Sequence, residues 1–309
     1  MTAGVALALA LIGPTCPAAI RDAATTPGRT PLELDCSLSL GRDDVVTRPL
    51  VISGASAGGM TLDCNGGRLG TPGRRVTAAG PTVLIRADAT GRPADVTIRA
   101  CRIFGAIRIW GLGAGGDYES LRTASRRPDF TARAQTLAPT RIRVERVTIT
   151  ADGTIPLYIG PGVTGVELVG STLDGRSDAT AIYLDHESAR NRIVDNTITT
   201  RTTRELIAVD GSAENHIEAN RLRLNGRPGI LLYRNCGERG VIRHQTPSRN
   251  RIIGNTFTGA NWLWPRLVVE NAREGRRSYC GDDAGYPFGS SRDDGDGGRD
   301  NLIRDNRRR

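Results

Sequence analysis

A short segment that contains asparagine recurs along the second half of the chain, and it constrains the fold more than any other feature. Each copy has an apolar stretch, a polar pair that ends in Asn, and then a further short strand-like stretch. Ser171 and Cys101 take the Asn position in two earlier segments, VELVGSTL and VTIRACRI. The four Asn copies are RIVDNTIT from Arg192, HIEANRLR from His216, RIIGNTFT from Arg251 and NLIRDNRR from Asn301.

The spacing of these copies predicts a solenoid of short strands. The first spacings are 25 residues (171 to 196) and 24 residues (196 to 220), and inserted loops extend the later ones to 35 and 51. A leucine-rich repeat is not indicated, because such repeats need a Leu-rich consensus, whereas these strands are rich in β-branched residues. One coil of this length cannot bury its own apolar face, so coils must stack about 4.8 Å apart. Asn suits the bends, because it tolerates left-handed backbone angles and its amide can hydrogen-bond between coils.

The stretch from about Thr140 to Asn306 resembles the right-handed β-helix repeat of pectate-lyase-like proteins, and the N-terminal half resembles it more faintly. The resemblance implies that residues 20–309 form a single all-β domain, a right-handed parallel β-helix with long loops on one edge. It specifies an activity poorly, since the superfamily includes lyases, hydrolases, epimerases and proteins without known chemistry.

The strand after each Asn turn carries polar residues at its outward positions. These strands read AIRIWG, IPLYIG, AIYLDHES, LIAVDGS, ILLYRNC and RLVVENA. Because side chains alternate between the two faces of a strand, one outward column is predicted to contain Trp110, Gly160, Asp185, Asp210, Arg234 and Glu270. The second column, two residues earlier, is predicted to contain Arg108, Tyr158, Tyr183, Ala208, Leu232 and Val268.

Asp185 and Asp210 are thus predicted to lie on adjacent coils. Two carboxylates at that distance repel unless one is protonated or a cation lies between them. Arg234 would relieve part of the repulsion, and a Ca²⁺ ion held by Asp185 and Asp210 would relieve more. The alternative is an ordinary solvated ladder that keeps the coils in register.

Three long inserts, at 111–139, 235–250 and 271–300, follow the same strand position in their coils. They are predicted to leave one edge of the solenoid and to form the walls of a groove, where binding sites on rigid scaffolds usually occur. A sugar ring could stack on the aromatic side chains of this groove. The residues expected to contact substrate are Arg108, Trp110, Tyr158, Asn235, Arg243, His244 and Glu270.

Three functions remain open for such a groove. The first, and favoured, is cleavage of an acidic polysaccharide by β-elimination. In this reaction the two aspartates would hold a cation or orient the base, and Arg234 would neutralise the substrate carboxylate or act as the base. His186 or Tyr183 would be the acid–base partner. Pectate-lyase-like enzymes also pair acidic cation ligands with a catalytic Arg, although no complete lyase signature is present. The second is glycoside hydrolysis by Asp185 and Asp210. The third is glycan binding without catalysis. The candidate catalytic residues are Asp185, Asp210, Arg234, His186 and Tyr183.

The net charge of +9 favours a polyanionic partner. All 42 basic residues are arginines, a bias that a GC-rich genome would also produce. No basic stretch interleaved with aromatics is present, so a nucleic-acid partner is not expected. We therefore expect a monomer that acts on an acidic polysaccharide.

The first residues, MTAGVALALALIGPTCPAA, have the apolar stretch and the small residues of a signal peptide over residues 1–19. A short hydrophobic strand is the alternative. No other segment has the length of a membrane span. Export predicts a secreted or periplasmic location.

The six cysteines contain no CxxC pair, so a zinc site is not expected. Export would favour disulfides, and the pairings expected are Cys36 with Cys64 and Cys236 with Cys280. Buried free thiols are the alternative.

Overall fold

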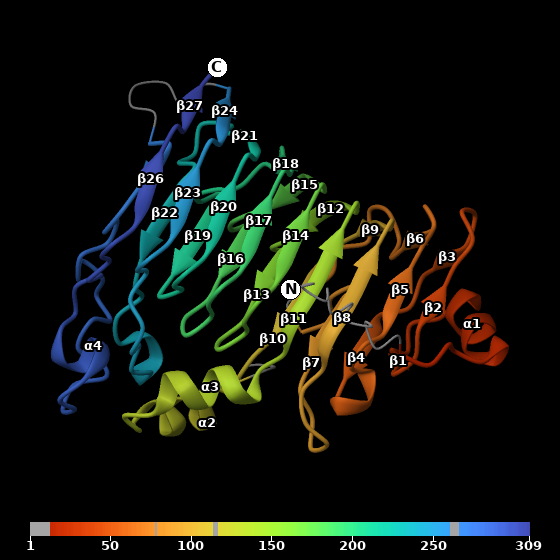
Figure 1. Ribbon diagram of the computed structural model, residues 1–309, viewed down its shortest axis with the longest axis horizontal. Helices are drawn as coiled ribbons and strands as arrows, with labels where there is room; N and C mark the ends of the chain where they lie inside the picture. Colours follow the sequence, from red (N-terminus) through yellow and green to blue (C-terminus); the bar gives the residue numbers. More distant parts are fainter. Residues whose placement is uncertain (1–12, 78, 114–116, 260–265) are drawn as a thin grey trace, which may run out of the picture.

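The computed structural model describes residues 13–77, 79–113, 117–259 and 266–309. Three parallel sheets of nine strands run along a solenoid, and successive strands enter the three sheets in turn (Figure 1). The predicted all-β, right-handed parallel β-helix is thus confirmed. The first sheet contains β1 (Leu32–Leu34), β4 (Leu50–Ser53), β7 (Val83–Arg86), β10 (Ile107–Trp110), β13 (Leu157–Ile159), β16 (Ile182–Leu184), β19 (Ile207–Asp210), β22 (Ile230–Tyr233) and β25 (Val268–Val269).

The second and third sheets complete each coil. The second contains β2 (Leu38–Ser39), β5 (Thr61–Asp63), β8 (Ala94–Arg99), β11 (Thr140–Glu145), β14 (Glu167–Val169), β17 (Arg192–Val194), β20 (His216–Glu218), β23 (Arg251–Ile253) and β26 (Leu302–Arg304). The third contains β3 (Val45–Val46), β6 (Arg68–Leu69), β9 (Arg102–Phe104), β12 (Thr148–Gly153), β15 (Thr172–Ser177), β18 (Thr197–Ile198), β21 (Arg221–Arg223), β24 (Thr256–Thr258) and β27 (Arg307–Arg308).

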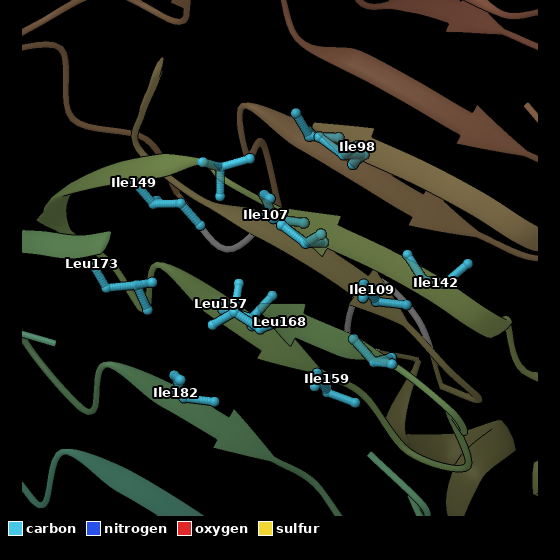
Figure 2. Packing of buried hydrophobic residues seen from close by; sticks show 14 of the residues in the cluster. Ile98, Ile107, Ile109, Ile142, Ile149, Leu157, Ile159, Leu168, Leu173 and Ile182 are labelled. Carbon is cyan, nitrogen blue, oxygen red and sulfur yellow. The ribbon is translucent and has the colours of Figure 1, made fainter. Parts of the chain in front are cut away.

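The interior of the solenoid is a stack of aliphatic side chains (Figure 2). Ile107 and Ile109 of β10 pair in register with Leu157 and Ile159 of β13, and all four are fully buried. Burial of one such side chain contributes about 1.5–3 kcal/mol. The repetition of this contact from coil to coil fixes which side chains point outward.

Two asparagine ladders run through the turns of the solenoid, where the repeat indicated one. In the predicted ladder, the side-chain oxygen of each Asn accepts bonds from the backbone N–H and the side-chain amide of the Asn one coil before it, as between Asn196 and Asn220. The ladders contain Asn196, Asn220, Asn255 and Asn306 on one side, and Asn191, Asn215, Asn250 and Asn301 on the other. The second ladder lies five positions before the first in every copy.

The left-handed backbone angle occurs one residue before the ladder position, not at the Asn itself. Asp195 and Ala219 have φ values of 55° and 56° and precede Asn196 and Asn220. The Asn side chain is thereby directed inward, where its amide bonds to the next coil. The residue before it points into solvent, which explains why its identity varies along the repeat.

Three disulfides are present, and they join Cys16 to Cys36, Cys64 to Cys101, and Cys236 to Cys280. The predicted Cys236–Cys280 bond is confirmed. The predicted Cys36–Cys64 pairing is wrong, because Leu38 pairs with Leu62, which places Cys36 and Cys64 at opposite ends of this strand pair. Three disulfides indicate an extracytoplasmic, oxidising location.

Helix α1 (Ala18–Thr25) packs at one end of the solenoid beside β1–β3 (Figure 1). Ala24 of this helix is fully buried in the core. Most of the predicted signal peptide, residues 1–12, lies outside the described residues, so its boundary stays a prediction. Cleavage after Ala19 would remove Cys16 and leave Cys36 without its partner.

The three inserts follow strands β10, β22 and β25 of the first sheet. They contribute α2 (Tyr118–Ser125), α3 (Phe130–Leu137), the short 3₁₀ helix η3 (Glu238–Gly240) and α4 (Gly289–Arg292). A second 3₁₀ helix, η1 (Ala55–Ala57), lies after β4. In the described part of the chain, no helix combines the length and apolar character needed to cross a bilayer.

Candidate functional site

The first sheet brings together most of the polar residues predicted for its outward face. Tyr158 of β13 pairs in register with Arg108 of β10 and with Tyr183 of β16. Leu184 pairs with Val209, so the residues that follow them, Asp185 and Asp210, lie on adjacent coils as predicted. The rings of Tyr158 and Tyr183 stack with centroids 5.8 Å apart, and the Arg108 guanidinium lies over the Tyr158 ring at 4.7 Å.

The predicted position of Arg234 in this column is wrong. Strand β22 pairs with β19 so that Tyr233 lies opposite Asp210 and Leu232 lies opposite Val209. Leu232 is therefore inside, and Tyr233 occupies the column position. The alternation of the sequence does not reveal this register, because Leu231 and Leu232 are both apolar and adjacent.

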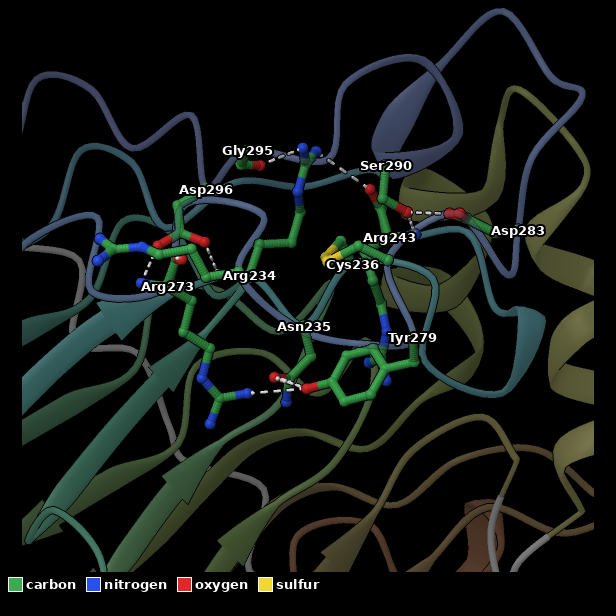
Figure 3. Close-up of a disulfide and its surroundings, with 12 residues drawn as sticks. Arg234, Asn235, Cys236, Arg243, Arg273, Tyr279, Asp283, Ser290, Gly295 and Asp296 are labelled. Atoms are coloured by element: carbon green, nitrogen blue, oxygen red, sulfur yellow. Dashed lines mark hydrogen bonds between the residues drawn. A yellow bond between two sulfur atoms is a disulfide. The ribbon is translucent and has the colours of Figure 1, made fainter.

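Arg234 instead holds the loop at 293–296. Its guanidinium donates to the carbonyl oxygens of Asp293 and Gly295, and its backbone N–H donates to the Asp296 carboxylate at 3.1 Å (Figure 3). Two other predicted contacts also lie apart from the aspartates. The Glu270 carboxylate accepts a bond from Asn301 at 2.7 Å, and His244 Nε2 lies 2.7 Å from the carbonyl oxygen of Ser125.

Asp185 is the centre of a compact cluster of charged and polar groups. Its Oδ1 lies 2.9 Å from His186 Nδ1 and 3.3 Å from Arg243 Nη1, and its Oδ2 accepts the hydroxyl proton of Tyr158. Arg243 also contacts His186 Nδ1 directly. Arg243 lies in the 235–250 loop, and it takes the role next to the aspartates that the sequence assigned to Arg234.

Asp210 lies in a second cluster on the next coil. Its Oδ1 accepts the backbone N–H of Asn235 at 2.8 Å, and its Oδ2 accepts the side-chain amide of Asn235 at 2.6 Å and the hydroxyl of Tyr183. Tyr279 in turn donates to Asn235 Oδ1 at 2.8 Å (Figure 3). Asp210 is fully buried, so it acts on a bound molecule only through Tyr183 or Asn235.

The two aspartates have opposite pKa shifts. Burial acts to raise the pKa of Asp185, but the charge and hydrogen bond of His186, together with Arg243 and Tyr158, hold it below its ordinary value. Burial raises the pKa of Asp210, and the charge of Asp185 adds to this rise. Burial also raises the pKa values of Tyr158 and Tyr183 well above the ordinary value, so both phenols keep their protons.

The side chains around the two aspartates do not fit the predicted Ca²⁺ site. Ca²⁺ takes about six to eight oxygen ligands, whereas the groups that contact the carboxylates are mostly hydrogen-bond donors, and one of them is a guanidinium. Among the described residues, the group of three suitable side chains found close together is Cys236, Cys280 and Asp294, in which both cysteines form a disulfide. We assign no step to a metal.

A cavity of about 370 Å³ opens above the Asp185 cluster. Its floor contains side chains of the first sheet, and its walls come from the inserts that carry α2 and η3. Residues that the sequence predicted for the site form much of it, namely Arg108, Trp110, Tyr158, Tyr183, Asp185, His186 and Arg243. Its volume lies in the range of small-ligand sites.

Several residues at this site were not predicted from the sequence. Tyr233 donates to Glu205 Oε1 at 2.8 Å, and the Arg273 guanidinium lies 3.6 Å from the Tyr233 ring centroid. Arg273 and Tyr279 come from the 271–300 insert, and the repeat does not predict the backbone path of this insert. Tyr233 has a signal, since it lies in the repeat, but the predicted columns with Leu232 and Arg234 outward place Tyr233 in the interior, an error of one residue in register.

Comparisons with known proteins give no assignment of function. Neither a family model nor a curated protein matches the chain. Two solved structures show a low likeness. The surface protein and adhesin PfbA of Streptococcus pneumoniae is 10% identical, with 82% of this chain and 73% of that chain covered and a TM-score of 0.41. An alginate lyase from Paenibacillus sp. str. FPU-7 is 13% identical, with 72% and 84% covered and a TM-score of 0.28.

Proposed function

We propose that this protein is a secreted or periplasmic enzyme that cleaves an acidic polysaccharide by β-elimination in the cavity above Asp185. The observation that carries the proposal is the pair of aspartates on adjacent coils with opposite pKa shifts. Two carboxyl groups whose surroundings move their pKa values apart typically serve the base and the acid side of a reaction.

The cavity favours a negatively charged sugar. Arg108 lies on its floor with 8% of its surface exposed. Among the described residues its guanidinium bonds to Thr154 at 3.5 Å, and its Nε has no partner. A buried guanidinium without a carboxylate is costly. The carboxylate of a uronate residue would supply the missing partner, and this contact would neutralise the charge that opposes removal of the neighbouring proton.

The β-elimination reaction needs a base that removes a proton from the sugar and an acid that protonates the leaving glycosidic oxygen. In β-elimination a base removes the proton on the carbon beside the carboxyl group, the C–H electrons form a C=C bond, and the bond to the glycosidic oxygen breaks as that oxygen takes up a proton. His186 Nδ1 lies beside the Asp185 carboxylate, and His186 Nε2 is buried without a partner among the described residues. We assign the base to this nitrogen, in the tautomer whose Nδ1–H donates to the Asp185 carboxylate and leaves the Nε2 electron pair free.

Tyr183 is the assigned proton donor. Its hydroxyl keeps its proton at neutral pH and contacts Asp210, whose raised pKa favours the protonated carboxyl. A protonated Asp210 can pass a proton to Tyr183 as Tyr183 protonates the leaving oxygen. Hydrolysis by the two aspartates as direct acid and nucleophile is less favoured, because Asp210 does not line the cavity, whereas Asp185 and His186 do.

The proposal is tested by incubating the purified protein with alginate, pectate, glucuronan and glycosaminoglycans, with and without a chelator. Elimination gives an unsaturated product that absorbs in the ultraviolet. New reducing ends without this absorbance would show hydrolysis instead, and binding of a glycan without turnover would show a non-catalytic module.

Replacing Arg108 with Gln is expected to raise KM for the acidic substrate about tenfold to a hundredfold, the range for loss of a charged hydrogen bond. The reason is that the variant leaves the substrate carboxylate without its guanidinium partner. Steady-state kinetics measure the effect, with Arg223→Gln on the exposed face of β21 as the control. An unchanged KM in a folded Arg108→Gln variant would rule out this carboxylate contact.

The activity is expected to fall as the pH rises through the raised pKa of Asp210, because the proton that Asp210 passes to Tyr183 is then lost. This decline should occur above the pH at which an ordinary Asp carboxyl ionises. Asp210→Asn removes the titrating group, so the decline should be absent from its profile of kcat/KM against pH. The same decline in wild type and variant would assign it to another group.

A further inference from the structure

A second hollow of about 550 Å³ adjoins the catalytic cavity along the first sheet. The two share Tyr183 and Glu238 in their walls. The second hollow is rich in arginine, since Arg204, Arg266, Arg273 and Arg277 all line it, against two glutamates. It therefore has an excess of positive charge, although the proposed reaction assigns no role to it.

Arg273 is the arginine that points most clearly to a ligand. It is 8% exposed, and its guanidinium lies against the Tyr233 ring. Its side chain donates to the Tyr279 hydroxyl at 3.2 Å (Figure 3). Among the described residues, no carboxylate lies within 4.0 Å of its guanidinium. A cation buried to this degree normally has an anionic partner, because the desolvation cost is otherwise uncompensated.

The carboxylates near this hollow are already engaged. Glu205 pairs with Arg204 at 2.8 Å and accepts the Tyr233 hydroxyl. Glu238 lies 3.6 Å from Arg243, on the side of the catalytic cavity. Asp210 accepts its bonds from Asn235 and Tyr183, as described above. Among the described residues none of them forms an ion pair with Arg273, although the charge of Asp210 acts to raise the pKa of its guanidinium.

The guanidinium is held in place by the loop that carries it. The backbone N–H of Arg273 donates to the Asp296 carboxylate at 2.8 Å, and the same carboxylate accepts the backbone N–H of Arg234. The Cys236–Cys280 disulfide joins this loop to the 235–250 insert (Figure 3). Arg273 is thus preorganised, which lowers the entropy lost when an anion binds.

We propose that the second hollow is a subsite for another acidic group of the same polysaccharide, a carboxylate or a sulfate ester, and that Arg273 binds it with help from Arg277. This inference rests on the proposed function, because the substrate must continue from the catalytic cavity past Tyr183. Arg108 and Tyr233 belong to strands four steps apart in the first sheet, or about 19 Å at the usual strand spacing. A disaccharide in the catalytic cavity cannot reach that far, whereas a longer oligosaccharide can.

The test is calorimetric binding of uronate oligosaccharides from disaccharide to decasaccharide, a sulfated oligosaccharide and a neutral one. Arg273→Gln is expected to weaken binding of the long acidic chains at least tenfold, the loss typical of a charged hydrogen bond, and to leave the disaccharide unchanged. Arg292→Gln, on the exposed surface of α4 in the same loop, is the matched control. Arg277→Gln should also weaken binding of the long acidic chains, but by less. Because the Arg277 side chain is exposed, this variant leaves the buried contact of Arg273 with Tyr233 unchanged.

The outcomes separate the subsite from the reaction. Binding of long acidic chains that depends on Arg273, without any unsaturated product, would support the subsite and overturn the proposed elimination. Elimination with equal affinity in wild type, Arg273→Gln and Arg277→Gln would overturn the subsite alone. Preference for the sulfated over the uronate chains would identify sulfate as the group bound, and equal binding of the neutral chain would overturn the inference.

Discussion

Replacing Asp185 with Asn is expected to lower kcat/KM on the acidic polysaccharide by about 10²- to 10⁴-fold, the range for loss of general acid–base catalysis. The Asp185 carboxylate contacts His186 Nδ1, Arg243 and Tyr158. Asn keeps the shape but removes the charge, so His186 loses the group that orients it and stabilises its protonated form. The ultraviolet absorbance of the product measures the rate.

The control for this variant is Asp195→Asn. Asp195 is exposed, lies next to the Asn ladder and has a φ of 55°, a conformation that Asn tolerates well. It should keep full activity. Arg243 is buried beside Asp185, so the melting temperature of Asp185→Asn must be measured as well. Tyr158→Phe removes one hydrogen bond without leaving a buried charge, and it should lower the rate less. A folded Asp185→Asn protein with wild-type kcat/KM would contradict the proposed mechanism.

Replacing Asn220 with Ala is expected to lower the free energy of unfolding by about 3–5 kcal/mol, since several buried groups lose partners that are each worth about 1–3 kcal/mol. Asn220 is fully buried. Its amide donates to Asn255 Oδ1 at 2.9 Å and to the Ile193 carbonyl oxygen at 2.7 Å. Its own Oδ1 accepts the backbone N–H and the side-chain amide of Asn196, each at 3.0 Å.

Denaturant unfolding followed by circular dichroism measures this loss. Asn306→Ala is the matched control, because Asn306 is the last member of the same ladder, is partly exposed and has no described Asn after it. Water can replace part of its bonds, so its loss should be clearly smaller. Equal losses at the two positions would show that the ladder adds nothing beyond ordinary hydrogen bonds at the surface of a turn.

The repeat was sufficient to predict the fold and the place of five site residues. Once the coils are in register, strand alternation leaves no other choice than to place on one face the residues Arg108, Tyr158, Tyr183, Asp185 and Asp210. The second ladder could also have been predicted, since each copy has another Asn five positions before the first. A repeat therefore specifies those residues whose surroundings are the neighbouring coils.

The remaining residues depend on contacts that the repeat does not encode. Arg243 and Arg273 lie in inserts whose course is fixed by a disulfide and by side chains such as Asp296. The error at Arg234 has a different origin, namely two adjacent leucines in ILLY that fit either register. The Cys36–Cys64 prediction failed because similar sequences around two cysteines do not place them opposite each other.

The constant rise of the solenoid has a consequence for which substrates such a protein accepts. Arg108 lies on the rigid stack and Arg273 is held against Tyr233 of β22, so the length of glycan that can engage both is fixed by how many coils separate β10 from β22. Duplication of one coil would increase that length by about 4.8 Å without altering the residues around Asp185. Chain-length preference could thus change by gain or loss of whole coils, independently of the chemistry.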